Sequence, residues 1–250
     1  MGYGLGLVDR VNMSMAQLQM ADDLGMSQTV FGAAASIFFT TYTSLQIPAN
    51  YMLSKVGAKR CLAAYVITWA LIAGCHGLVR NSTELMILRV LLGAAEAGYY
   101  PGCIYFLTRW FPKQVYSQAV ALLLSSAALL AVLLAGTSGL IMDKFDGVWG
   151  MRGWRWLFLI QGLPGVPLGL CFLLFFDEKP SDAAWLSPHE KIFLADNCAD
   201  KQESRNDSES LITQVRRLLM MPSTYTIASC WLAGTLAAYT SSFFNIKIIQ

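Results

Sequence analysis

Charged side chains are scarce in this sequence. Asp, Glu, Lys and Arg make up 14% of the 250 residues, whereas hydrophobic residues make up 55%. A soluble domain usually carries about 25% charged residues. The composition therefore excludes an ordinary soluble domain and indicates an integral membrane protein in a lipid bilayer. The net charge of +2 is too small, and the basic residues are too dispersed, to indicate a nucleic-acid-binding protein.

Patterns that bind metals or carry out catalysis are also lacking. The six cysteines are scattered without a CxxC pair, and the two histidines, His76 and His189, are far apart in sequence. We interpret the cysteines as small buried apolar residues and expect no metal or other cofactor. No nucleophile–base pair or metal-ligand set is visible within the apolar runs. This lack argues against one class of protein that the composition allows, a membrane-embedded enzyme.

Long apolar runs dominate what the sequence does contain. About 20 apolar residues cross a bilayer as a helix. The sequence predicts six such spans and the start of a seventh, at residues 1–21, 28–53, 61–79, 84–108, 118–142, 156–176 and 223–246. The predicted fold class is therefore an all-α polytopic membrane protein.

Glycine and proline recur inside these spans. Small residues allow helices to approach closely in lipid, so we expect tight packing at the glycines of the fifth and sixth spans: Gly136, Gly139, Gly162, Gly165 and Gly169. Proline removes a helical hydrogen bond and kinks a helix. We expect kinks at Pro48, Pro101, Pro164 and Pro167.

Basic residues in the connections predict the orientation. They gather after the second and fourth spans, at Lys55, Lys59, Arg60, Arg109 and Lys113. Cytoplasmic loops carry an excess of Lys and Arg, so both connections, and with them the N-terminus, are predicted to be cytoplasmic. Arg152 and Arg155, after the fifth span, are the exception to this pattern.

The spans define three segments: a six-helix bundle at 1–176, a cytoplasmic linker at 177–222, and the start of a second bundle at 223–250. The linker holds nine acidic and six basic residues. Within it, Ser187–Glu190 is typical of a capping box that opens a short helix, and residues 200–210 are predicted to be disordered. A six-helix bundle followed by a charged linker and a seventh helix is half of a twelve-helix design. We therefore expect this sequence to be a fragment, a truncated gene model or a splice form.

Apart from Glu84, the first residue of the fourth span, four charged residues lie inside the predicted spans. Arg89 and Glu96 lie in the fourth span, and Asp9 and Arg10 lie in the first. A charge at the centre of a bilayer costs about 2.5–3.5 kcal/mol on the insertion scale, and such residues commonly mark a substrate or proton path. Seven residues apart on a helix, Arg89 and Glu96 point to the same side, about 10 Å apart along its axis.

Both a functional and a structural role fit these charges. Arg89 suits a carboxylate ligand through two parallel hydrogen bonds, and Glu96 could gain and lose a proton. Alternatively, Arg89 neutralises Asp9 or Glu96 and ties two helices together; both roles hold if the salt bridge opens during transport. Asp9 and Arg10 could instead reach the membrane interface by snorkelling. Between Arg89 and Glu96, Gly93 leaves room for a ligand or a close neighbour.

Five stretches stand out when they are taken in order: LVDRVNMSMA (7–16), YTSLQIPANYMLSKVGAKR (42–60), LRVLLGAAEAGYYPGCIYFLTRWFP (88–112), GWRWLFLIQGLP (153–164) and AWLSPHEK (184–191). Together they resemble the major facilitator superfamily and specifically its anion:cation symporter family. Such relatives include sugar-acid/proton symporters, allantoate and nicotinate permeases, and sialin-like carriers. The resemblance implies the N-terminal six-helix half of a twelve-helix transporter, plus the start of helix seven, with the site between two halves near the midplane.

The resemblance also implies roles for individual residues. Asp9 and Glu96 take the place of the proton-linked carboxylates, and Arg10 takes the place of the substrate-binding arginine. Among the remaining substrate-site candidates, Arg89 matches the arginine of span four, and Tyr42 and Gln46 match polar cavity positions of span two. Tyr100 is a further candidate because it follows Glu96 by one helical turn.

The connection after the second span is similar to the superfamily's gate motif. The matching residues are Lys55, Gly57, Lys59 and Arg60. Ser54 stands where an aspartate is usual, and Asn50 stands where a glycine is usual. In the sixth span, Gln161 replaces a glutamate found in many relatives and so removes one candidate titratable group.

These features predict a secondary active transporter that carries a small organic anion together with protons by alternating access. The expected partners are that anion, protons and the lipid bilayer, and a full-length protein is expected to be a monomer in the plasma membrane. The second alternative is a membrane fragment that does not transport and only associates with other membrane proteins.

Overall fold

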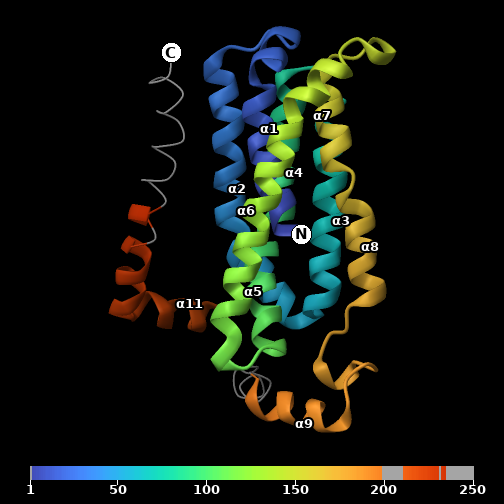
Figure 1. Cartoon of the computed structure of the whole chain (residues 1–250). Coiled ribbons are helices and arrows are strands. Elements are labelled where there is room, and N and C mark those ends of the chain that lie inside the picture. The colour runs from blue at the N-terminus through green and yellow to red at the C-terminus, as the bar shows by residue number, and fades with distance from the viewer. Residues whose placement is uncertain (1, 199–210, 231, 235–250) are drawn as a thin grey trace. The chain divides into compact units, whose positions relative to one another are not determined.

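The described residues divide into two compact units. The structure, a computed structural model, describes residues 2–198, 211–230 and 232–234 (Figure 1). The units comprise Met1–Lys201 and Gln202–Gln250. Every regular element of the described residues is a helix, which confirms the predicted all-α class.

The first unit contains the predicted six-span bundle. Its helices are α1 (Gly2–Asp23), α2 (Gln28–Val56), α3 (Ala58–His76), α4 (Ser82–Glu96), α5 (Tyr99–Trp110), α6 (Lys113–Lys144), α7 (Gly153–Gly162) and α8 (Gly165–Phe175). The short helices η1 (Val148–Gly150), η2 (Pro180–Asp182) and α9 (Pro188–Asn197) follow α6 and α8. The second unit contains α11 (Leu211–Met220) and a helical stretch at 222–230. Most of the predicted seventh span lies outside the described residues.

Four helices of the described part are long and apolar enough to cross a membrane. They are α2, α3, α6 and the combined stretch Gly153–Phe175. The first and fourth predicted spans fall outside this set for two different reasons. Helix α1 carries several polar and charged residues, and the fourth span is divided between α4 and α5.

Proline explains why the fourth span is two helices rather than one kinked helix at Pro101. Helix α4 ends at Glu96 and α5 begins at Tyr99. Pro101 has no N–H to donate to the carbonyl of Ala97, four residues earlier, so the helical bonding fails there. The sixth span breaks in the same way at Pro164, between α7 and α8, whereas α2 continues through Pro48.

Small residues pack α8 against α3, as predicted for the sixth span. A Cβ atom at Gly165 would lie 2.7 Å from the Cβ of Ala70, and one at Gly169 would lie 2.5 Å from a side-chain carbon of Ile67. The same expectation is wrong for the fifth span. A Cβ at Gly136 or Gly139 would meet no atom of the described structure within 4 Å.

The unexpected arginines of the fifth connection are paired with acids. Arg152 binds Asp22 at 2.8 Å, and Arg155 binds Asp23 at 3.0 Å. Arg155 also donates a 2.7 Å hydrogen bond to the carbonyl of Val79, which joins the connections at this end of the bundle. These ion pairs tie the connection after α6 to the end of α1.

The predicted capping box opens α9. The Ser187 hydroxyl accepts a hydrogen bond from the Glu190 N–H at 3.3 Å, and the Glu190 carboxylate accepts one from the Ser187 N–H at 2.9 Å. Pro188 occupies the first helical position. The hydrogen bonds from Ser187 lower the pKa of Glu190 because they favour its charged form. The segment predicted to be disordered, 200–210, lies outside the described residues.

Candidate functional site

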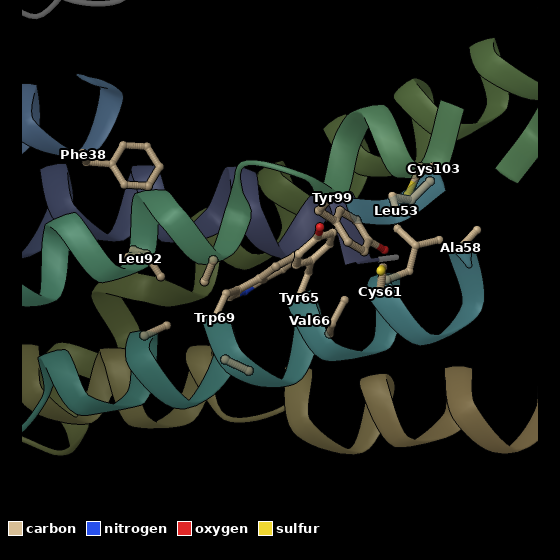
Figure 2. Close-up of a cluster of buried hydrophobic side chains, with 14 residues drawn as sticks. Phe38, Leu53, Ala58, Cys61, Tyr65, Val66, Trp69, Leu92, Tyr99 and Cys103 are labelled. Atoms are coloured by element: carbon tan, nitrogen blue, oxygen red, sulfur yellow. The ribbon is translucent and has the colours of Figure 1, made fainter. Parts of the chain in front are cut away.

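Two hydrophobic clusters pack around the four charged residues. One cluster contains Trp69 with residues of α2, α3, α4 and α5 (Figure 2), and the other contains Trp154 with residues of α1, α4 and α7. Along α4, Arg89 falls between Leu85 of the second cluster and Leu92 of the first. Together the four residues form a charged layer inside the bundle, in which Arg89 has apolar packing on both sides.

Burial in this layer is nearly complete. Asp9 and Glu96 are 3% exposed and Arg89 is 2% exposed. Arg10 retains 21% exposure and places its Nη2 atom 3.3 Å from the Glu96 Oε2 atom. The structure thus pairs α1 with α4 through Arg10 and Glu96.

Aromatic rings surround the Arg10 guanidinium. Its central carbon lies 5.0 Å from the ring centre of Tyr42, 5.5 Å from that of Phe38 and 5.9 Å from that of Phe39. A cation over a ring face is stabilised by about 0.5–2 kcal/mol, more where water is excluded. Helix α2 therefore holds the guanidinium in place and leaves its hydrogen-bonding edge directed to Glu96.

Arg89 differs from Arg10 in its contacts. Its Nε and Nη2 atoms have no hydrogen-bond partner among the described residues, and neither does the Oδ2 atom of Asp9. The carboxylates whose charges act on Arg89 are those of Asp9 and Glu96. The structural role in which Arg89 forms a direct salt bridge is therefore not seen; its charge acts on both carboxylates without contact.

A pocket opens beside the Arg10–Glu96 pair. It holds about 220 Å³ of space not filled by atoms, part of which is open to the surroundings. Its walls come from α1 to α5, and its lining residues are Tyr3, Gly6, Arg10, Tyr42, Trp69, Glu96, Tyr99 and Tyr100. The structure thus brings four predicted residues to one pocket: Arg10, Tyr42, Glu96 and Tyr100. Asp9 and Arg89 lie outside its lining, as does Gln46, which is half-buried on α2.

Four lining residues were not predicted. Tyr3 and Gly6 precede Arg10 by seven and four residues, so helical periodicity could have placed them on its face. A Cβ at Gly6 would lie 3.5 Å from the Glu96 Oε2 atom, an ordinary contact distance, so Gly6 lies directly against the carboxylate. Trp69 and Tyr99 meet edge to face at 4.9 Å (Figure 2). Nothing in the local sequence distinguishes those two from ordinary core aromatic residues.

The space beside Gly93 is filled by the backbone of α2 rather than left open for a ligand. A Cβ atom there would lie 2.6 Å from the backbone carbonyl of Phe38 and 3.1 Å from the backbone nitrogen of Tyr42. Helices α2 and α4 therefore touch backbone to backbone at this point. This contact sets the distance between the α2 rings and the α4 carboxylate.

Gln161 has a packing role. Its side-chain amide donates hydrogen bonds to the Leu134 carbonyl at 3.1 Å and to the hydroxyls of Thr137 and Ser138 at 3.2 and 3.3 Å. These bonds join α7 to α6. A neutral amide donor makes them, whereas an ionised carboxylate could not.

The predicted gate motif lies at the opposite end of the bundle from the arginine–aspartate pairs and involves a residue that the sequence did not single out. Glu178, just after α8, accepts hydrogen bonds from the backbone N–H groups of Ala58 at 2.6 Å and Lys59 at 2.7 Å. Its Oε1 atom also lies 3.1 Å from the Arg109 Nη1 atom. Glu178 therefore caps the start of α3, where the dipole favours a negative charge.

Gly57 makes this cap possible. Its φ of 101° lies in a region that favours glycine, and a Cβ there would lie 3.1 Å from the Glu178 carboxylate. Lys55 and Arg60 are exposed and Lys59 is half-buried. Ser54, in the place of the usual aspartate, donates its hydroxyl to the Tyr51 carbonyl at 2.8 Å within its own helix.

Replacing Glu178 with alanine is expected to release the start of α3. The first N–H groups of a helix have no partner within it, so Glu178 provides the protection at Ala58 and Lys59. We expect their amide hydrogen exchange to accelerate about tenfold or more, which corresponds to the roughly 1–3 kcal/mol of an unsatisfied donor. Exchange measured by mass spectrometry over residues 57–60 tests this. Glu190→Gln is the matched control, and equal protection in both variants would contradict the cap.

The fold and the pocket are together typical of one class of membrane protein. A bundle of membrane-spanning helices, with paired charges and an aromatic-lined pocket in its interior, is typical of a multi-pass membrane transport protein.

The chain belongs to the Major Facilitator Superfamily, whose family profile matches residues 2–249. This membership confirms the superfamily indicated by the sequence and identifies an integral multi-pass membrane protein of a transporter family rather than of an enzyme family.

Relatives and a solved structure agree with this assignment. The "Putative tartrate transporter" of Agrobacterium vitis is 40% identical over 203 residues, which cover 81% of this chain and 45% of the relative. The "Putative metabolite transport protein NicT" of Pseudomonas putida is 40% identical over 209 residues, or 83% of this chain and 48% of the relative. This chain therefore spans about half the length of the curated relatives it matches.

The solved structure shows the fold alone. A bacterial homologue of the human lysosomal transporter Spinster, in an inward-facing and occupied conformation, superimposes with a TM-score of 0.65 at 21% identity. The match covers 72% of this chain and 43% of that chain. The fold is thus consistent with the N-terminal half of a major facilitator transporter.

Proposed function

We propose that this chain forms the N-terminal half of a symporter that carries a small organic anion together with protons by alternating access. The observation that carries the proposal is the 3.3 Å pair between Arg10 and Glu96 at the edge of an open pocket. A cation that is held by rings and paired with a carboxylate can exchange that carboxylate for one belonging to a substrate.

Substrate and proton binding are coupled through this exchange. A substrate carboxylate that pairs with Arg10 takes the place of the Glu96 carboxylate. Glu96 is 3% exposed, and a buried carboxylate that loses its cation is strongly disfavoured. Glu96 therefore takes up a proton as the substrate binds, and it gives up that proton when it pairs with Arg10 again.

Asp9 and Arg89 complete the proposed site from behind the pocket. Asp9 acts as a second proton-linked carboxylate, close enough to Glu96 for their charges to repel. Arg89 acts on both carboxylates and so limits the repulsion between them. Protonation of Glu96 relieves the same repulsion, which links the two carboxylates.

The pocket favours a small polyhydroxy or aromatic acid as substrate. Arg10 supplies two parallel donors for a carboxylate, and the hydroxyls of Tyr42 and Tyr100 can bond to a second polar group. The relative named for tartrate suggests a dicarboxylate as the substrate.

The proposed arrangement in the membrane follows the sequence. Residues 1–176 form the N-terminal bundle, 177–222 form the linker and 223–250 begin the second bundle. The N-terminus and the linker are assigned to the cytoplasm, in the plasma membrane, and the transporter is assigned as a monomer.

The substrate role of Arg10 is tested by tartrate binding and uptake. Arg10→Gln is expected to weaken binding by about 10–100-fold, since a hydrogen bond to a charged group contributes about 1.5–3 kcal/mol. Arg10→Lys keeps the charge but loses the two-pronged geometry, so its affinity should be intermediate. Thermal stabilisation by tartrate and uptake into proteoliposomes measure both variants. Arg80→Gln, at an exposed arginine, should match the unmodified protein; unchanged binding in Arg10→Gln would overturn the assignment.

The alternative is a membrane protein that binds no substrate and only associates with other membrane proteins. Under this alternative the folded, purified protein shows no stabilisation by tartrate or related acids. Saturable stabilisation that depends on Arg10 would exclude it.

A further inference from the structure

Helix α11 in the second unit has an apolar side and a basic side. Val215, Leu218 and Leu219 recur at spacings of three and four residues, so they lie on one side of the helix. The described residues leave this side largely open, because Leu218 is 54% exposed and Leu219 is 55% exposed. Arg216 and Arg217 lie on the remaining surface, both exposed, and α11 carries no acidic residue. The helix is therefore amphipathic and positively charged.

The end of α11 is tied to the helix that follows. A helical stretch begins one residue later, at Pro222, and runs in a different direction (Figure 1). The Thr224 hydroxyl donates a 2.8 Å hydrogen bond to the Leu218 carbonyl, and the Tyr225 hydroxyl donates one of 2.8 Å to the Leu219 carbonyl. Carbonyls at the end of a helix have no partner within it, and backbone groups without a partner are strongly disfavoured in lipid. These two bonds therefore suit a corner at a membrane surface.

This corner lies at the start of the seventh predicted span. Residues 223–246 contain no charged residue, and the family profile extends through residue 249. Three residues of extended chain reach at most about 11 Å, so the end of α11 at Met220 lies within that distance of the residue at which the span begins. The headgroup region on each side of a bilayer is about 5–8 Å thick. The chain connection alone therefore keeps α11 beside the membrane surface.

Arg216 lies at the boundary between the two sides of α11. Its position is about 60° from that of Leu219 around the helix axis. When Leu219 faces the acyl chains, Arg216 is therefore at the depth of the lipid phosphates. A guanidinium binds a phosphate through two parallel hydrogen bonds, and the Arg216 side chain is exposed.

We propose that α11 lies in the headgroup region of the bilayer, with Leu218 and Leu219 toward the acyl chains and Arg216 bound to the phosphate of an anionic lipid. The apolar side and the positive charge both match this partner, since basic amphipathic helices bind anionic membrane surfaces. The interaction fixes the end of the linker where the second bundle begins. It goes beyond the proposed function, because it does not depend on which substrate is carried.

The first experiment identifies what lies against Leu219. Benzoylphenylalanine, which cross-links to nearby C–H groups under light, replaces Leu219 in the full chain, and the protein is placed in nanodiscs of phosphatidylcholine with a minority of phosphatidylglycerol. Mass spectrometry of the irradiated protein is expected to show lipid adducts. The same photoreactive residue in place of Thr213, on the opposite side of α11, is the matched control and should lose them.

The same cross-link measures recognition of the headgroup. Phosphatidylglycerol should be enriched among the adducts over its share of the bilayer. Arg216→Gln should lower this enrichment about fivefold, which is the effect of one basic residue near an anionic surface. Arg216→Lys, which keeps the charge, should retain most of it. Because Arg216 is exposed, neither substitution disturbs the packing of the described residues.

Three outcomes overturn the proposal. Adducts between position 219 and protein would show that α11 packs against this chain or a second copy of it. Lipid adducts that are equally frequent at positions 213 and 219, or absent from both, would show a helix surrounded by lipid or by water. An enrichment that Arg216→Gln leaves unchanged would show that the headgroup is not recognised there. None of these measurements requires transport, so their results are independent of the tartrate tests.

Discussion

Replacing Glu96 with glutamine is expected to abolish accumulation of the substrate while leaving its exchange across the membrane. Glutamine has nearly the shape of glutamate but cannot bind and release a proton. In the unmodified protein, a gradient of one pH unit supports about a tenfold concentration ratio for each coupled proton, since tenfold corresponds to about 1.4 kcal/mol. Asp9 lies outside the pocket lining and is linked to the substrate only through Glu96, so in Glu96→Gln the substrate concentrations inside and outside should become equal whatever the pH gradient.

The expectation that substrate exchange is retained follows from the contact between Arg10 and Glu96. Arg10 lies 3.3 Å from the Glu96 carboxylate, so a neutral glutamine competes less strongly with a substrate for the guanidinium. Binding in Glu96→Gln should therefore be as tight as in the unmodified protein or tighter, and less dependent on pH.

Uptake of labelled tartrate into proteoliposomes, with and without a pH gradient, measures the accumulation, and counterflow against unlabelled tartrate measures the exchange. The matched control is Glu190→Gln, which changes an exposed carboxylate in the linker and keeps a side chain suited to the capping box. If Glu96→Gln still concentrates tartrate against its gradient, Glu96 is not the coupling residue.

Hydropathy predicted the spans well because lipid imposes one simple rule on length and polarity. All six spans of the first bundle have a helical counterpart. The rule says less about where a span is interrupted. The break between α4 and α5 follows from the carbonyl that Pro101 leaves unbonded, yet Pro48 lies inside a continuous α2. Neighbouring helices decide between those outcomes, and they are not visible in a local sequence.

The charged residues of the site could be predicted because charges are rare in membrane spans. Asp9, Arg10, Arg89 and Glu96 stood out on composition alone. Trp69 could not be found in this way, because an aromatic residue that lines a pocket looks the same in sequence as one that fills a core. Glu178 is separated from Ala58 by 120 positions, and only the folded bundle brings them together.

The pairing pattern also needed the structure. Sequence spacing places Arg89 and Glu96 on one side of α4, which made Arg89 a natural partner for either carboxylate. In the folded bundle, Glu96 instead forms its ion pair with Arg10 of α1. The Nε and Nη2 atoms of Arg89 have no hydrogen-bond partner among the described residues. Spacing within a helix says which residues share a side, but the partner helix decides which of them meet.

Replacing Gly93 with alanine is expected to destabilise the bundle and weaken substrate binding together. The added methyl group would lie 2.6 Å from the Phe38 carbonyl and 3.1 Å from the Tyr42 nitrogen. Both are backbone atoms and cannot rotate away, so α2 must move. Overpacking of this kind costs about 1–3 kcal/mol, which should appear as a lower Tm in thermal unfolding of the purified protein.

The effect on substrate binding follows from the aromatic rings that α2 places around Arg10. The rings of Phe38 and Tyr42 lie within 5.5 Å of the Arg10 guanidinium, so a displaced α2 removes part of its support and enlarges the gap to Glu96. Gly136→Ala is the matched control, because a methyl group there meets no described atom within 4 Å. Alanine is the better helix former by about 1 kcal/mol, so Gly136→Ala should keep or raise the Tm and leave tartrate affinity unchanged. Equal stability and affinity in the two variants would mean that α2 and α4 do not touch backbone to backbone at Gly93, and the pocket would then need another explanation for its width.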